Sequence, residues 1–492
     1  MQLQDASAPD PQPIHRARPR IGAWLTVISM CLVAACSPAP PPNILFIVID
    51  TLRADRLDWY DTNRQLTPFL ESLAAHGNVF WNAYAASSWT SPSMASLWTS
   101  RYQSQHRVTV FSSVLADTEP TLPAILREHG YVTGGFSANS LLSAQLGFGQ
   151  GFDEYQVYPK DSATKPHDMF YKEPAEHLNA DSLAWLDTLP TGQGAQPVFL
   201  YLQYMEPHFP YFAPKSSVDL IFKRRPNQAQ EQAMLAQMLS GQARWAQPQG
   251  LALDVVGALY DAEVLTIDER LRQLFAQLET RHFLEHALVV ITADHGEELM
   301  DHGDMTHGKT LYNEVIHVPL LFVLPGQSGR TDVREVVSLL DVAPTVLDLA
   351  GIASPTSFEG RSLRPATRRA RRLTGVMPFV EALFHKTADR VTAAYSELLR
   401  RADSTVPPVH TRSLVIGSHK LVVDAGGVST FYDLDTDRGE QRAAVLRESD
   451  RHALQEAMAT IAERAARNVS PARTAPIDEQ TRERMRALGY AD

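Results

Sequence analysis

The chain has 492 residues, of which 44% are hydrophobic, and its formal net charge is −11 at pH 7. A chain of this length and apolar content can bury one large core and a smaller one. The acidic balance argues against a nucleic-acid partner, because such a partner requires a basic face.

The first 36 residues have the pattern of a signal peptide. Three arginines precede an apolar run over 21–35, which has the length of a signal peptide and is short for a membrane span. The run ends at Cys36 in a pattern that resembles a bacterial lipobox. We therefore expect an exported protein that is anchored to a membrane through a lipidated Cys36, on the periplasmic face and at the outer membrane of a Gram-negative source. An uncleaved membrane anchor is the alternative, and it also exports the domain. Residues 37–42, with four prolines, form a stiff tether.

Beyond the tether, apolar β-branched runs alternate with segments of helical spacing. This alternation predicts a mostly parallel sheet that is covered by helices on both faces, in an α/β domain over 43–390. After about residue 390 the pattern changes to antiparallel strands followed by a helix, which predicts a smaller α+β subdomain over 391–492. The predicted strands are 43–49, 79–84, 131–137, 198–204, 287–292, 318–324, 413–423 and 430–434, and the predicted helices are 67–77, 121–129, 254–278, 341–349 and 452–466, with a helical insertion near 216–250.

Two acidic residues directly follow predicted strands. Asp50 ends the run 43–49, and Asp294 follows the run 287–292, with His295 beside it. Ligands of open parallel sheets bind beyond the carboxyl ends of the strands. Either aspartate alone is most simply a turn residue, but together with the histidine they predict a site for one divalent metal ion.

Thr90 is the candidate nucleophile. It precedes Ser91 and Pro92, and proline is a natural residue of the first helical turn. Its hydroxyl would lie at a helix N-terminus, where free N–H groups favour anions. A free hydroxyl is a poor nucleophile, but coordination to a divalent ion stabilises the alkoxide. Two alternatives are that Thr90 is only an N-cap and that Ser91 is the nucleophile.

Three segments carry a family resemblance: 42–55, 88–97 and 292–297 resemble the sulfatase family of the alkaline phosphatase superfamily, and the resemblance extends over about 43–492. It implies the α/β sandwich and the antiparallel C-terminal subdomain described above. Sulfatases convert the cysteine or serine of a C/S-x-P-x-R motif into formylglycine. Here Thr90 fills the first position and Met94 fills the arginine position. The two cysteines, Cys31 and Cys36, both lie in the leader, so we expect no formylglycine.

The metal site also departs from the family pattern. Sulfatases commonly have two adjacent aspartates where this chain has Asp50 and Thr51, and an Asn or Gln where it has His295. One carboxylate fewer and one imidazole more shift the preferred ion from Ca²⁺ towards Mn²⁺ or Zn²⁺. The expected ligands are Asp50, Thr90, Asp294 and His295. This set looks more like the phosphonate monoester hydrolases and the threonine-dependent phosphoglycerol and phosphoethanolamine transferases of the superfamily.

The resemblance also implies groups that act on the leaving group. His208 matches a histidine that contacts the oxygens of the transferred group, where it would stabilise charge or protonate the leaving oxygen. His307 and Lys309 lie where the family keeps a histidine or lysine with that role. A structural histidine at the end of a strand is the alternative for His208.

The sequence therefore predicts a metal-dependent enzyme that acts on an anionic phosphate or sulfate ester through Thr90. Phosphoester chemistry is favoured because formylglycine is absent. The alternatives are a true sulfuric ester hydrolase of the arylsulfatase kind, a phospho-headgroup transferase and a non-catalytic anion-binding module. No oligomeric state is predicted.

Overall fold

A computed structural model describes residues 40–159, 172–192, 194–239, 248–364, 392–400 and 409–476. The chain divides into one unit over Met1–Pro41 and a second over Pro42–Asp492, and the second contains both sheets. The predicted leader, the first half of the tether and the boundary near residue 390 lie outside the described residues. Among the residues that are described, no helix combines the length and the apolar character needed to cross a membrane.

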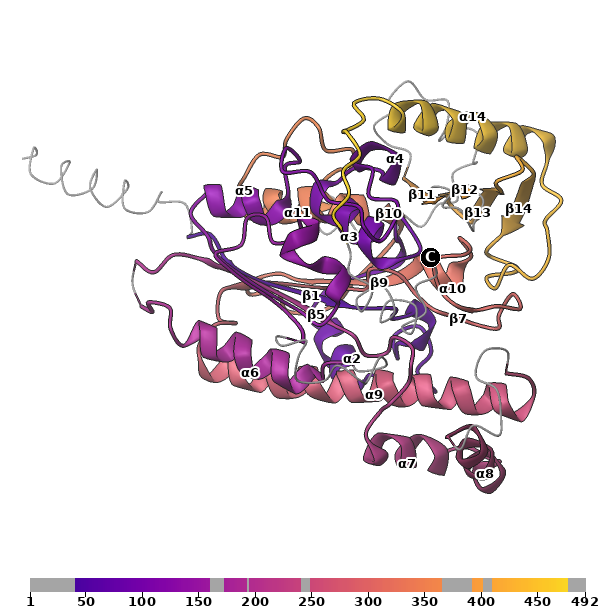
Figure 1. Cartoon of the computed structure of the whole chain (residues 1–492), viewed down its shortest axis with the longest axis horizontal. Helices are drawn as coiled ribbons and strands as arrows, with labels where there is room; N and C mark the ends of the chain where they lie inside the picture. The colour runs from indigo at the N-terminus through magenta and orange to yellow at the C-terminus, as the bar shows by residue number, and fades with distance from the viewer. Residues whose placement is uncertain are drawn as a thin grey trace, which may run out of the picture. The chain divides into compact units, whose positions relative to one another are not determined.

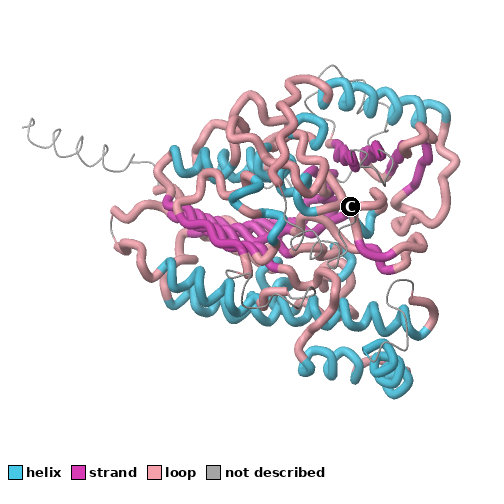
Figure 2. Tube along the Cα trace, in the orientation of Figure 1, coloured by secondary structure: helices cyan, strands magenta, loops and turns pink. Residues whose placement is uncertain are grey.

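Strands form two principal sheets in the described residues (Figure 2). The large sheet has eight strands in the order β10-β2-β9-β6-β1-β5-β3-β4, and the small one has four in the order β11-β12-β13-β14. The strands are β1 (Asn43–Ile49), β2 (Asn78–Tyr84), β3 (Val132–Ser137), β4 (Glu154–Val157), β5 (Val198–Tyr204), β6 (Ala287–Thr292), β7 (Glu298–Leu299), β8 (Met305–Thr306), β9 (His317–Val323), β10 (Thr331–Ser338), β11 (Ala393–Arg400), β12 (Val409–Ile416), β13 (His419–Val423) and β14 (Ser429–Asp433).

Helices cover both faces of the large sheet. Figure 1 shows α2, α6 and α9 on one face and α3, α5 and α11 on the other. The predicted α/β sandwich with a small antiparallel subdomain is thus confirmed. The helices are α2 (Pro68–Ala74), α3 (Thr90–Thr99), α4 (Gln103–His106), α5 (Leu122–Glu128), α6 (Ala175–Leu186), α7 (Lys215–Lys223), α8 (Gln228–Leu239), α9 (Leu251–Thr280), α10 (Asn313–Ile316), α11 (Val342–Leu349) and α14 (Glu448–Ala465).

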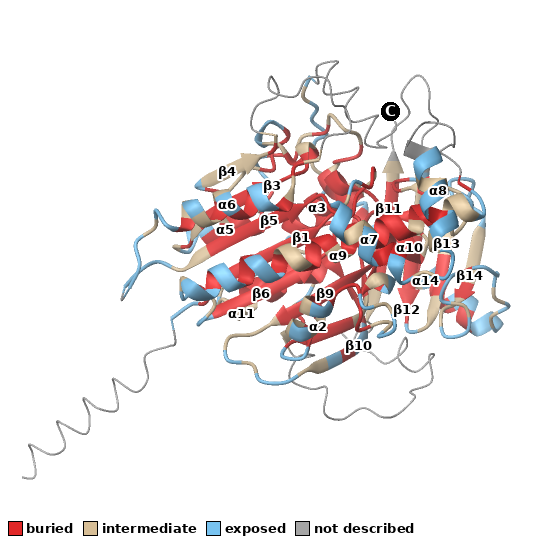
Figure 3. Cartoon of the chain, turned by 90° about the horizontal axis from the view of Figure 1, so that it is seen from below, coloured by how far each residue is buried: buried red, intermediate tan, exposed pale blue. Residues whose placement is uncertain are grey.

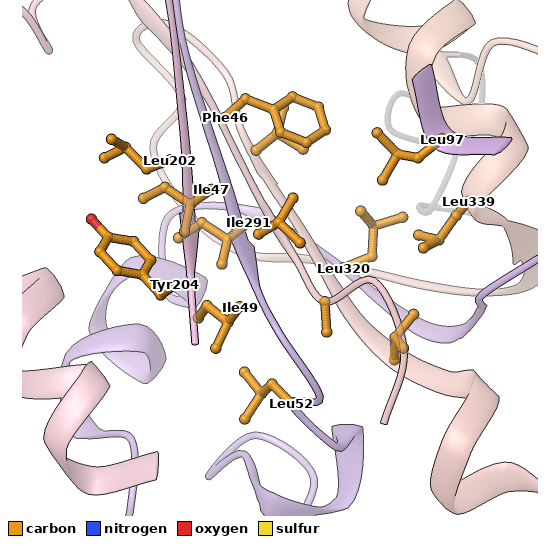
Figure 4. Close-up of a cluster of buried hydrophobic side chains, with 14 of the residues drawn as sticks. Phe46, Ile47, Ile49, Leu52, Leu97, Leu202, Tyr204, Ile291, Leu320 and Leu339 are labelled. Atoms are coloured by element: carbon orange, nitrogen blue, oxygen red, sulfur yellow. The ribbon is translucent and has the colours of Figure 1, made fainter. Parts of the chain in front are cut away.

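The central strand β1 sets the geometry of the sheet. It pairs in parallel with β5 on one side, where Ile44 faces Phe199, and with β6 on the other, where Asn43 faces Ala287. Residues 44–49 are fully buried, as expected of a strand with helices over both faces. Figure 4 shows their apolar side chains packed with those of the neighbouring strands and of α3. Because β1, β5 and β6 run the same way, their carboxyl ends meet at one edge.

Three sequence predictions about strands need correction. The run 413–423 is two strands, because Gly417, with φ of 59°, turns the chain back on itself between β12 and β13. The run 318–324 does form a strand, β9, but it is antiparallel to both of its neighbours. Strands β4, β7, β8, β10 and β11 were not predicted. Strands β4 and β10 are the edges of the large sheet, where burial and apolar patterning are weakest.

A buried ion pair joins the small sheet to the large domain. Lys420 Nζ on β13 lies 2.6 Å from Glu440 Oε1, and both side chains are fully buried. Asn313, the first residue of α10, completes the link: its backbone N–H donates to Glu440 Oε2 at 2.6 Å, and its Oδ1 accepts from Lys420 Nζ at 3.1 Å. A buried charge that loses its partner is strongly destabilising.

We predict that Lys420→Met lowers the free energy of unfolding by about 3 to 5 kcal/mol, because Glu440 is left buried and unpaired. Chemical denaturation measures the change. The matched control is Lys215→Met, which removes an exposed partner of Asp219 and should cost less than about 1 kcal/mol. Equal effects of the two substitutions would contradict the structural role of the Lys420–Glu440 pair.

Candidate active site

Helix α3 presents Thr90 at the carboxyl edge of the sheet. Trp89 is extended, with φ of −154° and ψ of 160°, and the helix begins at Thr90. Every residue of α3 is buried, as Figure 3 shows. This burial explains Met94, which occupies the core rather than the site. Thr90 therefore stands at the first turn of a helix whose other side chains fix its position.

The hydroxyl of Thr90 meets three other polar groups. It hydrogen-bonds to the Asp294 carboxylate, accepts from Asn139 Nδ2 at 3.3 Å and lies 3.3 Å from His295 Nε2. Ser91 is buried beside it, and its hydroxyl has no hydrogen-bond partner among the described residues. The contacts thus join Thr90, rather than Ser91, to the predicted metal ligands.

Asp50, Asp294 and His295 form one cluster, called here the carboxylate–histidine cluster. The strands β1 and β6 are paired in parallel, and this pairing brings Asp50 and Asp294 together. His295 Nε2 lies 3.7 Å from Asp50 Oδ1 and 3.5 Å from Asp294 Oδ2. One possible ligand atom from each residue lies within 4.8 Å of the others, and all three side chains are fully buried.

The electrostatics of the cluster fit a divalent cation. Burial, and then the charge of Asp294, raise the pKa of Asp50 to about 8, and burial raises the pKa of Asp294 to about 7. Asp50 Oδ1 accepts no hydrogen bond from the described residues. His295 Nδ1 lies 2.9 Å from the Gly296 carbonyl, which assigns the proton to Nδ1 and leaves the lone pair of Nε2 facing the carboxylates. Two carboxylates and one imidazole nitrogen are a set of ligands that suits borderline divalent metals such as Mn²⁺ and Zn²⁺.

Two amide side chains hold these carboxylates, and the sequence analysis did not identify them. Asn139, just beyond β3, donates to Asp50 Oδ2 at 2.6 Å. Gln203 on β5 lies 3.4 Å from both Asp50 Oδ2 and Asp294 Oδ2. Asp50 and Asp294 were identified because polar residues at the carboxyl ends of parallel strands form ligand sites, and the same rule applies to β3 and β5. Gln203 stands out there as the only amide side chain in an apolar strand.

The structure brings His208 and His307 together beside the cluster. Their ring centroids are 5.0 Å apart, and the ring of His307 lies 4.4 Å from that of His295. Burial, and then His307, lower the pKa of His208 well below its usual value. Lys172 Nζ donates to the His208 carbonyl at 2.8 Å, so a residue far back in the sequence helps to fix this loop.

Glu297 connects the two histidine segments. Its Oε1 lies 2.8 Å from His307 Nδ1. Its Oε2 accepts from the backbone N–H of Phe209 at 3.2 Å and from the Tyr211 hydroxyl at 3.4 Å. The sequence analysis overlooked this residue, although it lies only three positions after Asp294. One buried carboxylate therefore orients His307 and holds the loop that carries His208.

Lys309 does not join these residues in the described structure. Its ammonium pairs with Asp304 Oδ1 at 2.6 Å and donates to the Met305 carbonyl at 3.0 Å. The side chain is 39% exposed, whereas His307, two residues earlier, is buried. Of the two leaving-group residues expected from this hairpin, the structure brings only His307 to the cluster.

A second group, Glu298, His302 and Glu314, also has metal-ligand spacing. Both ring nitrogens of His302 face acceptors, Glu314 Oε1 at 2.5 Å and the Glu440 carbonyl at 3.2 Å. Burial opposes the charge, but the hydrogen bond to Glu314 raises the pKa of His302 to about 9. In the described structure this group is an ion-paired network.

Comparisons with known proteins agree with this geometry. The sequence model of the family described as "Sulfatase" matches residues 42–352. Arylsulfatase K of Bos taurus is 25% identical over 397 residues, which cover 70% of this chain and 71% of that protein. The Delta 4,5-hexuronate-2-O-sulfatase of Bacteroides thetaiotaomicron is 25% identical over 398 residues, with coverage of 73% and 78%.

Solved structures show the same fold. The phosphonate monoester hydrolase of Silicibacter pomeroyi superposes with a TM-score of 0.67 at 23% identity, over 88% of this chain and 99% of that one. The family model covers more than half of the 492 residues, and the strands and helices that it spans build the described site. The chain belongs to the sulfatase family of ester-cleaving hydrolases, within the alkaline phosphatase superfamily.

Proposed function

We propose that this sulfatase-family hydrolase cleaves a phosphate or sulfate ester through the unmodified hydroxyl of Thr90. The observation that carries the proposal is the position of that hydroxyl, which contacts Asp294, His295 and Asn139 at once. The chain has two cysteines, Cys31 and Cys36, both before the domain, so no cysteine is available for conversion to formylglycine.

Asp50, Asp294 and His295, together with Thr90, would hold one divalent ion. The imidazole favours Mn²⁺ or Zn²⁺ over Ca²⁺. Such an ion supplies Lewis acidity, which stabilises the alkoxide form of a hydroxyl and polarises an ester oxygen. Asn139 and Gln203 support this role because their amides orient the two carboxylates from the side of β3 and β5.

The side chains suggest an in-line displacement. Thr90 Oγ1 attacks the phosphorus or sulfur, and the bond to the leaving oxygen breaks while the new bond to Thr90 forms. The hydroxyl proton leaves along the hydrogen bond to Asp294, and the leaving oxygen takes a proton from His307. Burial holds the pKa of His208 well below its usual value, so His208 is neutral and would contact the oxygens of the transferred group instead. Glu297 favours the cationic form of His307 because it faces Nδ1. Water then attacks the phosphorus or sulfur and gives a proton to the neutral His307, while the bond to Thr90 Oγ1 breaks and that oxygen regains the proton from Asp294. An acceptor alcohol in place of water would make the reaction a transfer.

Phosphoester chemistry is our first choice, since the formylglycine of sulfatases cannot form at Thr90. A sulfuric ester hydrolase is the second candidate, because the curated relatives include arylsulfatase K and a hexuronate-2-O-sulfatase. A non-catalytic anion-binding module is disfavoured by the complete set of oriented ligands around Thr90.

We also propose that the domain is exported and anchored through a lipidated Cys36. The support is the arginine-flanked apolar run before Cys36 and the proline-rich tether after it.

Metal binding tests the first part of the proposal. After chelation, adding Mn²⁺ or Zn²⁺ at about 100 times its Kd should stabilise the wild type by about 2.7 kcal/mol and raise its Tm. Asp50→Asn should abolish this thermal shift. Glu298→Gln, in the ion-paired network, is the control and should keep it. An unchanged shift in Asp50→Asn would place the metal elsewhere.

The nucleophile is tested with 4-nitrophenyl sulfate and bis(4-nitrophenyl) phosphate. Thr90→Ala should lower kcat at least about a thousandfold on the substrate that turns over, because the attacking atom is lost. Thr90→Ser should retain measurable activity. Ser91→Ala removes the neighbouring buried hydroxyl and should change kcat by less than about tenfold. Loss of activity in Ser91→Ala with retention in Thr90→Ala would assign the attack to Ser91.

Glu297 is expected to act through His307. Glu297→Gln should lower kcat on the order of a hundredfold for an ester with a poorly acidic leaving alcohol, and much less for a nitrophenyl ester, since protonation matters most for the poorer leaving group. Glu298→Gln is the adjacent control. A loss in Glu297→Gln that is equal for both leaving groups would contradict the role of Glu297 in proton transfer.

A further inference from the structure

A buried ion pair contacts the loop that carries His208. This loop, residues 205–212, follows β5 and is called here the His208 loop. Lys172 lies just before α6 and Glu263 lies on α9, and these helices are side by side on one face of the large sheet (Figure 1). Lys172 Nζ is 3.0 Å from Glu263 Oε1, and the two side chains are only 8% and 2% exposed. Lysine is almost never buried in this way unless its charge is paired.

Both members of the pair also hydrogen-bond to the backbone of the His208 loop. Lys172 Nζ donates to the His208 carbonyl at 2.8 Å. Glu263 Oε1 accepts from the backbone N–H of Phe212, at the other end of the same segment. One ion pair therefore holds the loop at two points, and one of these points is the residue that faces the chemistry.

The ring of His208 is tied to the backbone of its own loop. Its Nδ1 donates to the Phe209 carbonyl, and its backbone N–H donates to the Met205 carbonyl at 2.7 Å. Because ring and backbone are joined within the loop, a shift of the loop carries the ring with it. The place of this ring, 5.0 Å from the centroid of His307, thus depends on what anchors the loop.

Glu206 adds a second carboxylate to this group. Its Oε1 accepts from the backbone N–H of Ala175 at 3.1 Å, so the segment that carries Lys172 meets the His208 loop at a further point. Burial, and then the charge of Glu263, raise the pKa of Glu206 to about 7. Glu206 can therefore take up a proton near neutral pH, whereas the ammonium of Lys172 is hydrogen-bonded to Glu263.

The energetics of such a pair favour a role in orientation. A buried ion pair is seldom more stabilising than apolar side chains of similar volume, because the cost of removing two charges from water offsets their attraction. What the Lys172–Glu263 pair adds is direction, since an ammonium and a carboxylate fix a carbonyl and an N–H that apolar side chains could not hold. Its contacts with the loop are made at His208 itself and at Phe212.

We propose that the Lys172–Glu263 pair holds the His208 loop so that the His208 ring meets the oxygens of the transferred group, which makes Lys172 a positioning residue for the reaction. This proposal rests on the proposed ester hydrolysis. Lys172 itself touches no reacting atom in this assignment, and it acts through the His208 carbonyl.

The main test replaces both charges at once. Lys172→Met combined with Glu263→Gln leaves no unpaired charge in the pair, and the glutamine oxygen can still accept from the Phe212 N–H. We expect this pair variant to lower kcat/KM for the nitrophenyl ester that turns over by about tenfold to a hundredfold, because a group that meets the substrate is displaced. Calorimetry on metal-loaded protein should show binding of inorganic phosphate or sulfate weakened about threefold or more.

A double-mutant cycle with His208→Ala distinguishes positioning from a merely structural role. His208→Ala alone should lower kcat/KM at least as much as the pair variant. In the His208→Ala background the pair replacement should change kcat/KM by less than about twofold, because the positioned ring is gone. An equal loss in both backgrounds, or no loss in the pair variant, would overturn the proposal.

Lys215→Met is the control, because Lys215 forms an exposed pair with Asp219. It should change kcat/KM by less than about twofold. Circular dichroism checks the folding of every variant, and Lys172→Gln enters the same cycle, with the same two expectations, if the pair variant does not fold.

The outcomes separate this proposal from the proposed function. If Thr90→Ala retains turnover while the pair variant and His208→Ala are non-additive, the positioning role stands and the proposed nucleophile fails. If Thr90→Ala abolishes turnover while the pair replacement acts equally in both backgrounds, the positioning role fails and the proposed function stands. If no ester is turned over, the phosphate and sulfate affinities complete the cycle. Anions that bind equally well to wild type and pair variant, or to neither, would then overturn the positioning role.

Discussion

Asp50 and Asp294 are both fully buried and lie close together at the carboxyl edge of the large sheet. The proximity of these two buried carboxylates is the constraint on which the arrangement of the whole candidate active site depends. The parallel pairing of β1 with β6 makes it unavoidable. Amides from β5 and from beyond β3 hold the oxygens, and the neutral ring of His295 turns its lone pair towards them. Burial raises the pKa of both acids, so a bound cation is the arrangement that allows both to be ionised.

Thr90 depends on this constraint, and the histidines depend on Glu297. The wholly buried α3 brings the Thr90 hydroxyl to the two aspartates, and Glu297 packs His307 against His295 while fixing the loop of His208. The backbone carbonyl of Glu297 also accepts a hydrogen bond from the guanidinium of Arg53. The buried Lys420–Glu440 pair keeps the C-terminal subdomain in register with the large domain.

The sequence predicted the parts of the site that follow from strand ends. Asp50 and Asp294 could be paired because both follow unbroken apolar strands. Asn139 was missed because it lies two residues beyond β3, where asparagine is usually a turn residue. Glu297 was missed because it meets His307 only when the hairpin of β7 and β8 folds back. In that hairpin Thr306 and Gly308 have φ of 71° and 76°, so side-chain directions do not follow residue spacing. The Lys309 ammonium accordingly pairs with Asp304. Gly417 likewise has a positive φ, and the turn at this residue divides the apolar run 413–423 into the two strands of a hairpin.

In the proposed reaction an unmodified threonine forms the covalent bond to the transferred group. The most direct measurement is mass spectrometry of the peptide that contains Thr90, after metal-loaded enzyme has been mixed with excess ester and quenched in acid. We expect an unmodified threonine before mixing and a phosphoryl or sulfuryl group on Thr90 afterwards. A label on Ser91 or on a histidine, with Thr90 unchanged while the ester is being consumed, would contradict this expectation.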